Sequence, residues 1–461
     1  MRTKFNFSTI LFGGLLLITS CKKGWLDAKS NKALVIPASL KDFQALLNNN
    51  TIFNAHFPGL GELSSDDYFE TYAKWQANSL ATERNAYIWA QDIYAGETYN
   101  NAVNNWRFGY SQVFNANTVL DGLEKIEQDA SSQNQWNDIR GSALFYRCFA
   151  FYNLAQLFST PFDSLKSETD LGIPLKLTSD INEKISRSTV KQTYDQIVSD
   201  LKASLRLLPA TPQYKTQPSK ASAYAMLAKT YLVIRDYKDA FLYADSSLQA
   251  YDYLIDYNSL TQGANATFPI SSLNQETIFY ATFDFYYTFF QQANFNVDTT
   301  LYDMYDDNDL RKSIFFFTNA GLLQYRGSYT GSTTLFGGLA VDEVYLIRAE
   351  CNARNGNLAA AMQDLNTLMA KRWKNTVVFQ PYVASTIQQA LSIILSERRK
   401  ELLFRGIRWA DLRRLNHEGA NIVLRRNLNG QSYSLLPNDP RYVLPIPPEE
   451  IQNSGIQQNI R

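Results

Sequence analysis

The sequence contains 461 residues, which is long enough for one large domain or for two. Its 44 lysine and arginine residues balance 44 aspartate and glutamate residues, so net charge provides no attraction for nucleic acid or an anionic membrane surface. The two histidines, His56 and His417, are far apart and lack metal-ligand spacing, which argues against a zinc centre or a Ser-His-Asp triad. Cys148 and Cys351 occur in helical patterns and are expected to be buried thiols rather than a long-range disulfide.

The N-terminus has the pattern of a lipoprotein signal peptide. A basic start precedes the apolar run 10–18, and the small residue Ser20 stands immediately before Cys21. We therefore expect residues 1–20 to be removed and Cys21 to carry the acyl chains, followed by a short tether at 21–30. Each acyl methylene buried in a membrane contributes about 0.8 kcal/mol, so two or three chains would anchor a folded domain. The alternative is an ordinary secreted protein whose cysteine follows the cleavage site by chance. No later segment is long and apolar enough to cross a bilayer.

Two long segments rich in aromatic residues lack a sustained period and are expected to be irregular. The first covers residues 48–105 and follows a short helix expected at 40–47. The second covers residues 251–340. Long inserts on a rigid scaffold are where binding surfaces usually lie.

Outside these inserts, apolar residues recur at helical spacing. Helices are expected over residues 106–158, 190–250 and 341–372. In the second group, Ala228 and Ala244 are small where two antiparallel helices would meet, close to the tetratricopeptide pattern, and the third group is a looser copy. The chain is therefore predicted to be mainly α-helical, with stacked tetratricopeptide-like helical hairpins as a scaffold for the aromatic-rich inserts.

The C-terminal segment 386–461 begins with a strongly charged helix. Its arginines and lysines are interspersed with Glu397, Glu401 and Asp411, so ion pairs inside the fold explain them better than a basic surface patch. We expect Trp409 and these charges to hold the last helix on the scaffold. We assign no catalytic role to Glu397 or Glu401.

Several motifs occur together in this chain. They are Cys21 with Trp25-Leu26-Asp27, the helical stretch Arg348 to Asn366, the group Glu397, Arg398, Glu401, Leu402, Gly406, Arg408, Trp409, Asp411 and Leu412, and the closing residues Leu444-Pro445-Ile446-Pro447, Glu450-Ile451 and Gln458-Asn459. Asp309-Leu310-Arg311 is a further Asp-x-Arg element. The combination resembles the SusD/RagB family of outer-membrane nutrient-binding lipoproteins of the Bacteroidetes, with departures at Arg405 and at the C-terminal end. It implies that residues 21–461 form a single SusD-like domain.

The resemblance implies a lipid-anchored protein of the outer membrane that captures an oligosaccharide, or in a variant a peptide. It implies delivery to a TonB-dependent SusC-like transporter, without catalysis or a cofactor. Sugar binding needs flat aromatic rings for the apolar sugar faces, and carboxylates, amides or arginine for the hydroxyls. The candidate residues in the two inserts are Asp66, Asp67, Tyr72, Trp75, Arg84, Trp89, Tyr94, Tyr99, Tyr286, Tyr287 and Asn294. Trp75 is the preferred platform, whereas Trp89, within an apolar run, is the one most expected to be buried.

Two other functions remain open on the sequence. A glycoside hydrolase needs two facing carboxylates roughly 5 to 9.5 Å apart, to which Asp66 and Asp67 or Asp306 and Asp307 could contribute. A protein adaptor would use the helical hairpins and bind no small ligand. The acidic run 303–309 lacks the alternating spacing and glycine of a calcium loop, so we expect a solvated acidic loop and assign no metal.

Overall fold

The computed structural model describes residues 37–98, 105–184, 186–261 and 267–461. The expected signal peptide, the lipid-bearing Cys21, the tether and Tyr99 lie outside these ranges. Within the described ranges, no helix combines the length and the apolar character that a membrane span requires.

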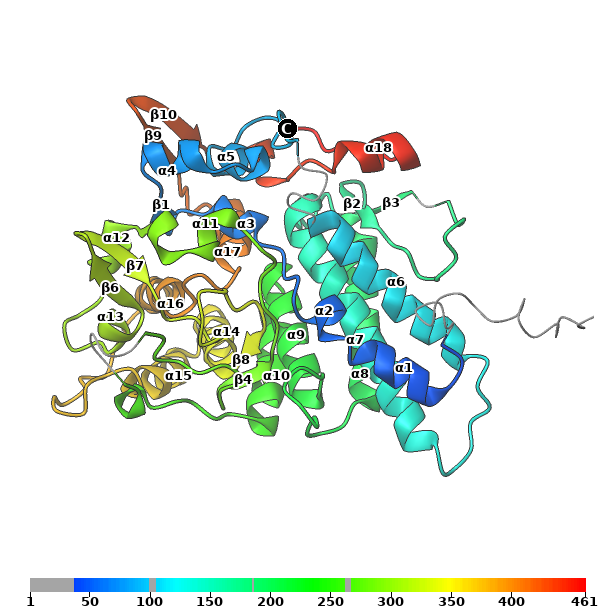
Figure 1. The fold of residues 1–461 in the computed structure, drawn as a ribbon. Coiled ribbons are helices and arrows are strands. Elements are labelled where there is room, and N and C mark those ends of the chain that lie inside the picture. Colours follow the sequence, from blue (N-terminus) through cyan, green and yellow to red (C-terminus); the bar gives the residue numbers. More distant parts are fainter. Residues whose placement is uncertain (1–36, 99–104, 185, 262–266) are drawn as a thin grey trace, which may run out of the picture.

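Long helices form the scaffold that carries both inserts (Figure 1). They are α6 (Asn105–Leu123), α7 (Gln133–Phe158), α8 (Val190–Leu207), α9 (Lys220–Val233), α10 (Tyr237–Ala250), α14 (Val341–Arg354), α15 (Leu358–Ala370), α16 (Ile387–Glu401) and α17 (Arg408–His417). Successive helices from α6 to α10 pack on one another, and α10 also packs on α14, so the series continues across the second insert. Helix makes up 48% of the structure, and the prediction of a mainly α fold is confirmed.

Shorter elements occupy the inserts and the ends of the described chain. The short helices are α1 (Leu40–Leu47), α2 (Asn50–Phe53), α3 (Leu60–Leu63), α4 (Tyr72–Ala77), α5 (Ala81–Tyr87), α11 (Tyr287–Phe290), α12 (Thr299–Tyr302), α13 (Arg311–Ile314) and α18 (Pro448–Ser454). The antiparallel strand pairs are β1 (Tyr68–Phe69) with β5 (Asn296–Val297), β2 (Leu171–Pro174) with β3 (Arg187–Thr189), β4 (Thr277–Phe279) with β8 (Leu339–Ala340), β6 (Phe316–Asn319) with β7 (Leu322–Tyr325), and β9 (Leu424–Leu428) with β10 (Gln431–Leu435). The inserts are thus less irregular than predicted, because helices of one or two turns are too short to produce a sequence period.

Local sequence determines where several helices begin and how closely they pack. Ser39 and Ser219 each cap a helix through a reciprocal pair of hydrogen bonds with the third helical residue, at the start of α1 and of α9. Ala228 in α9 and Ala244 in α10 are fully buried. Because neither side chain extends beyond Cβ, the two helices can approach closely, as their tetratricopeptide-like spacing predicts.

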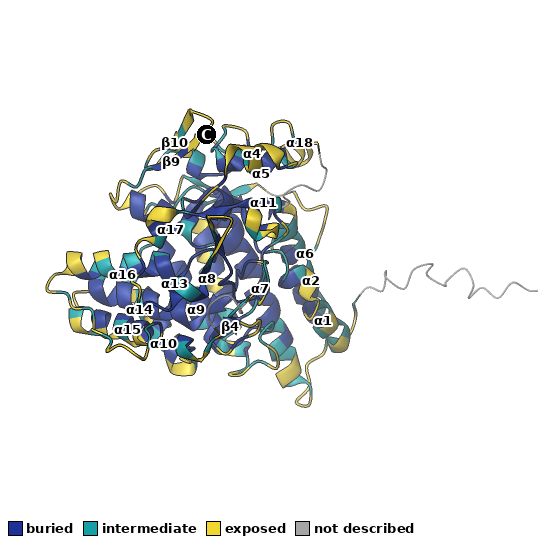
Figure 2. Cartoon of the chain, turned by 60° about the vertical axis from the view of Figure 1, so that its left-hand side comes forward, coloured by how far each residue is buried: buried dark blue, intermediate teal, exposed yellow. Residues whose placement is uncertain are grey.

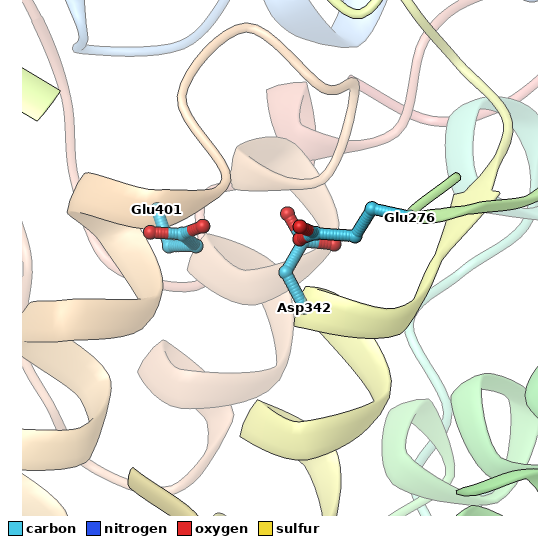
Figure 3. A group of neighbouring side chains, drawn as sticks. All are labelled: Glu276, Asp342 and Glu401. Carbon is cyan, nitrogen blue, oxygen red and sulfur yellow. The ribbon is translucent and has the colours of Figure 1, made fainter. Parts of the chain in front are cut away.

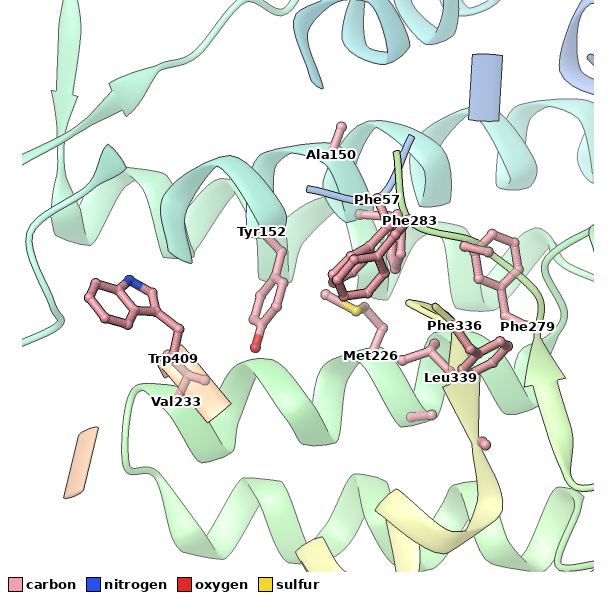
Figure 4. Close-up of a cluster of buried hydrophobic side chains, with 14 of the residues drawn as sticks. Phe57, Ala150, Tyr152, Met226, Val233, Phe279, Phe283, Phe336, Leu339 and Trp409 are labelled. Atoms are coloured by element: carbon pink, nitrogen blue, oxygen red, sulfur yellow. The ribbon is translucent and has the colours of Figure 1, made fainter. Parts of the chain in front are cut away.

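The hydrophobic core joins both inserts to the scaffold. Phe57 from the first insert stacks on Phe283 from the second, with ring centroids 5.0 Å apart, and both lie beside Met226 between α7 and α9 (Figure 4). Figure 2 shows α7 and α9 largely buried, whereas α4 and α18 present exposed faces. Cys148 and Cys351 are buried as free thiols, as predicted.

Candidate functional site

The two inserts are joined by hydrogen bonds between α5 and α11. The Glu83 carboxylate accepts hydrogen bonds from the backbone N–H groups of Tyr287 (2.8 Å) and Thr288 (2.9 Å). The Asn78 amide donates to Glu83 (3.2 Å) and to the Thr288 hydroxyl (3.2 Å). Strand β1 also pairs with β5, and α4 and α5 lie directly above α11 in Figure 1. Segments about 200 positions apart in the sequence therefore form one unit.

Two buried carboxyl groups form the polar joint beneath this unit. The Thr288 hydroxyl donates to Glu70 (2.9 Å), and Glu70 and Glu83 are 6% and 1% exposed. Burial raises the pKa of Glu70 to about 7 and raises the pKa of Glu83 above its ordinary value. These groups bind the backbone and the hydroxyl of the other insert, so their role is to fix geometry.

Aromatic rings are exposed on the outside of this joint. Phe69 and Tyr72 are 36% and 38% exposed, and Phe285 and Phe290 are 57% and 53% exposed. The Phe285 and Phe290 rings contact each other with centroids 5.0 Å apart. We refer to these four residues and Trp75 as the aromatic surface. Because folding alone does not require large apolar rings to lie exposed in solvent, these residues are candidates for contact with a ligand.

Trp75 and Tyr72 form a fixed pair of rings on α4. Thr71 caps this helix, and the two ring centroids lie 5.9 Å apart at an interplanar angle of 27°. The indole N–H of Trp75 donates to the Arg84 carbonyl (3.0 Å), which sets the orientation of the half-buried ring. The Arg84 guanidinium donates to the Asn78 carbonyl, so Arg84 stabilises the turn between α4 and α5.

A cavity of about 230 Å³ adjoins the second half of the aromatic surface. Its lining residues are Phe283, Asp284, Phe285, Tyr286, Phe289, Phe290, Thr333, Thr334 and Leu335. At its edge, His56 Nδ1 lies 3.0 Å from Asp284 Oδ1, and the His56 ring stacks on Phe108. Apolar rings with a few hydroxyl and carboxylate groups are the usual lining of a small-molecule site.

Four candidate residues lie in the interior, which corrects the prediction for Asp67, Tyr286 and Asn294 as exposed ligand contacts. Asp67, Trp89, Tyr286 and Asn294 are 1%, 2%, 2% and 7% exposed. Their polar atoms have internal partners: the Trp89 indole donates to the Ser64 carbonyl (2.9 Å), for example. Trp89 was expected to be buried, and that expectation is confirmed.

Asp66 and Asp67 connect the first insert to the C-terminal signature. Asp66 accepts two hydrogen bonds from Arg408 (2.7 and 2.8 Å), and Asp67 accepts one from Arg399 (2.8 Å). Burial opposes ionisation of Asp66, but the Arg408 and Arg399 guanidiniums outweigh it and hold its pKa well below the usual range. Both carboxylates are therefore engaged in ion pairs, and a ligand or a catalytic role at these positions loses support.

The remaining predicted residues divide between the surface and its edges. Tyr72 and Trp75 belong to the aromatic surface. Tyr287 is half-buried on α11, and Tyr94 is half-buried in the loop after α5. Tyr99 lies outside the described residues.

Sequence reasoning missed Phe69, Phe285 and Phe290. The run 283–290 contains six aromatic residues among eight. A short helix cannot bury all of its faces, so a run of this density signals that some rings are exposed. On β1 the alternation of the strand buries Tyr68 and exposes Phe69.

The ion-pair network predicted for the C-terminal helix is confirmed. Arg311 is fully buried and contacts Asp309 (2.6 Å), Glu397 (2.6 Å) and Glu401 (2.9 Å). Asp309, expected in a solvated loop, is 2% exposed, whereas the preceding acids of that run are exposed as predicted. The network fixes the second insert to α16.

A group of three buried acids lies beside this network (Figure 3). Oxygens of Glu276, Asp342 and Glu401 lie within 4.8 Å of one another, close enough to share a cation. Arginines supply the positive charge: Arg372 contacts Glu276 (2.6 Å) and Glu401 (2.8 Å), and Arg405 contacts Asp342 (3.1 Å). The group therefore belongs to the structural ion-pair network.

Two family models match this chain. Residues 24–232 match a SusD-like family model described as "Starch-binding associating with outer membrane". Residues 213–460, more than half of the chain, match the model of the SusD family. The chain belongs to the SusD family. The resemblance found in the sequence is confirmed.

Similar SusD-family proteins extend over most of this chain. SusD-like protein P2 of Formosa agariphila is 25% identical over 417 residues, which cover 77% of this chain and 79% of that protein. A SusD-like carbohydrate binding protein from Bacteroides vulgatus has a TM-score of 0.69 and 22% identity, and the match covers 91% of this chain and 97% of that one. A SusD superfamily protein from Bacteroides thetaiotaomicron has a TM-score of 0.71 and 22% identity, with 92% and 100% covered. These structures share the fold.

Membership in the SusD family also bears on the class of function. SusD-family members are binding proteins, so the prediction that this chain is not an enzyme is confirmed. The description of the first matched model associates its members with the outer membrane.

Proposed function

We propose that the aromatic surface captures an oligosaccharide for uptake across the outer membrane. Two comparisons support this ligand class. One matched family model is described as starch-binding, and a solved structure of this fold is described as carbohydrate binding. The observation that carries the proposal is the set of exposed rings on two inserts that Glu83 and Thr288 hold together.

The residues at this surface suit the chemistry of a sugar. The apolar faces of a pyranose ring pack on flat aromatic rings, which the pairs Tyr72–Trp75 and Phe285–Phe290 provide. Exposed amide side chains that could accept and donate hydrogen bonds to hydroxyls occur beside both pairs, at Gln76 and Gln291. Because the joint below is internally hydrogen-bonded, the rings are ordered before the ligand arrives, which lowers the entropic cost of binding.

The proposal includes a membrane anchor and a transport partner. Cys21 would carry the acyl chains and tether the domain at the cell surface. The captured ligand would pass to a TonB-dependent transporter of the SusC type. Family membership and the association of the matched model with the outer membrane support this part.

Replacing Trp75 with alanine is expected to weaken oligosaccharide binding at least tenfold, which corresponds to about 1.4 kcal/mol, because the stacking platform is lost. The measurement is calorimetric titration of the chain from Lys22 onward with neutral oligosaccharides, namely maltoheptaose, cellohexaose, laminarihexaose and xylohexaose. Trp136→Ala is the matched control, since Trp136 is also half-buried but lies on α7 outside the aromatic surface.

Each outcome of this titration has a distinct meaning. Saccharide binding that Trp75→Ala leaves unchanged would contradict the placement of the site. Binding of peptides instead of saccharides would keep the uptake role and change the ligand class. Shortening of the oligosaccharides would contradict a binding-only function, and silence with both saccharides and peptides would favour a protein adaptor.

A further inference from the structure

Two cavities flank the loop between α8 and α9, residues 208–219. One, of about 560 Å³, lies between this loop and the end of α1, and the other, of about 340 Å³, lies between the loop and the end of α10. Gln213 and Lys215 line both cavities. No lining residue belongs to the aromatic surface, and in Figures 1 and 2 α1 and β4 lie below α4 and α11. Volumes of roughly 300 to 1,000 Å³ are typical of small-molecule sites.

The loop between the cavities is anchored by its backbone. The Lys215 carbonyl accepts a hydrogen bond from the Tyr280 N–H group (2.7 Å). The Thr216 carbonyl accepts hydrogen bonds from the Tyr146 hydroxyl (2.9 Å) and the Asn54 amide (3.0 Å). The donors come from three different parts of the chain, so the loop is held in one conformation.

An aromatic ring is exposed on this anchored loop. Tyr214 lines the larger cavity and is 60% exposed, and Leu273, 49% exposed, lines the same cavity. The loop backbone is already fixed by Thr216 and Lys215, so the Tyr214 ring contributes little to holding the loop in place. A ring on a rigid loop can stack on a ligand at low entropic cost.

The polar groups of the larger cavity are almost all uncharged. Asn48, Asn50, Gln213 and Gln217 contribute amides, which both donate and accept hydrogen bonds, and the Gln217 amide donates to the Asn48 side-chain oxygen (2.9 Å). Among the residues lining either cavity, Lys215 alone is charged, and its ammonium group donates to the carbonyls of Thr277 (2.6 Å) and Gln275 (3.2 Å). No carboxylate lines either cavity. This composition suits a neutral ligand rich in hydroxyl groups, because no carboxylate is present to pair with a basic peptide and the single ammonium group already donates to two carbonyls.

We infer that the chain carries a second binding site for a neutral oligosaccharide, built on Tyr214 and the four amides. The Tyr214 ring packs on an apolar sugar face, and the amides of Gln213 and Asn50 bond to hydroxyls. This inference rests on the proposed function for the class of ligand, but its site is separate from the aromatic surface. Two sites on one chain hold a long polysaccharide more tightly than either alone, because the second contact forms at a high effective concentration.

The test is calorimetric titration of the full chain in detergent with maltoheptaose, cellohexaose, laminarihexaose and xylohexaose, together with the variants Tyr214→Ala, Gln213→Ala and Trp75→Ala. The expected result is two binding events for the unchanged protein with at least one of these sugars. Tyr214→Ala should weaken one event at least tenfold, and Gln213→Ala should weaken the same event. Tyr253→Ala is the matched control, because Tyr253 is a similarly exposed tyrosine that lines neither cavity.

The variants distinguish failure of this inference from failure of the proposed function. A single event that Trp75→Ala abolishes and Tyr214→Ala leaves intact would overturn the second site and retain the aromatic surface. A single event that Tyr214→Ala abolishes and Trp75→Ala leaves intact would support the site at Tyr214 and contradict the one at Trp75. No binding of any of the four sugars would overturn both the second site and the aromatic surface as saccharide sites. Because Tyr214 is exposed, its loss should leave the thermal unfolding temperature unchanged, which excludes misfolding as the cause.

Discussion

Replacing Arg372 with methionine is expected to lower the free energy of unfolding by about 3 to 5 kcal/mol, the usual cost of leaving a buried charge without its partner. Arg372 is fully buried and contacts Glu276 (2.6 Å) and Glu401 (2.8 Å), and it donates to the Ile255 carbonyl (2.7 Å). Its loss leaves the Glu276 carboxylate buried without its cationic partner, whereas Glu401 keeps its contact with Arg311 (2.9 Å). The measurement is urea unfolding at pH 7, followed by circular dichroism and tryptophan fluorescence.

The matched control removes an ion pair of the same length from the surface. Lys191 contacts Asp195 at 2.6 Å, but both side chains are about half exposed, so Lys191→Met is expected to cost less than about 1 kcal/mol. Arg372→Lys keeps the charge but loses the planar fork of donors, so its loss in free energy of unfolding should lie between those of Arg372→Met and Lys191→Met. A loss for Arg372→Met as small as that for Lys191→Met would show that the network contributes little to stability.

The helical scaffold is the part of the fold that the sequence predicts best. In α9 and α10, periodic apolar residues and alanines at 228, 240 and 244 indicate both the helices and their close contact, because the pattern is local. The ion pairs of residues 396–414 could also be predicted, since three acids are interspersed among seven bases at short spacing. The buried acids Asp342 and Glu276 were missed, because their partners Arg405 and Arg372 lie 63 and 96 positions away and the local sequence gives no signal of either pair.

The inserts could not be predicted in the same way, because their structure depends on contacts between distant residues. Asn78 bonds to Thr288, 210 positions later, and Asp66 bonds to Arg408, 342 positions later. Nothing in the sequence around Asp66 and Asp67 distinguishes an exposed polar turn from a turn whose carboxylates form ion pairs with arginines far along the chain. Composition indicated that the inserts are rich in aromatic residues, and the three-dimensional structure was needed to show that Phe285 and Phe290 are exposed and Tyr286 is buried.

A pH-dependent difference in stability is expected between the protein and its Glu62→Gln variant. Glu62 is 1% exposed and accepts hydrogen bonds from the Gly406 N–H group (2.9 Å) and the Ser65 hydroxyl (3.3 Å). Burial raises the pKa of Glu62 from 4.5 to about 8, and the negative charge of Asp67 adds to the effect. The folded state therefore holds a proton that the unfolded state has lost between these two pH values.

The sign of the effect follows from proton linkage. Between pH 4.5 and about 8 the unfolded state binds fewer protons at Glu62, so its contribution to the free energy of unfolding falls as pH rises, by about 1.4 kcal/mol per unit. Glutamine keeps the shape without titrating, so the variant should gain several kcal/mol over the unchanged protein across this window, with no further change outside it. Urea unfolding at intervals from pH 4 to pH 9 measures the difference.

A second carboxyl provides the comparison that makes this result specific to Glu62. Burial raises the pKa of Glu70 from 4.5 to about 7, so the difference for Glu70→Gln should level off about one pH unit lower than for Glu62→Gln. A general effect of pH on the fold would alter both variants over the same pH range. Two ranges that end about one pH unit apart would therefore be specific to the burial of each carboxyl group. A difference that does not vary with pH for Glu62→Gln would mean that this carboxyl is ionised in the folded state, with Arg408 near enough to compensate its charge.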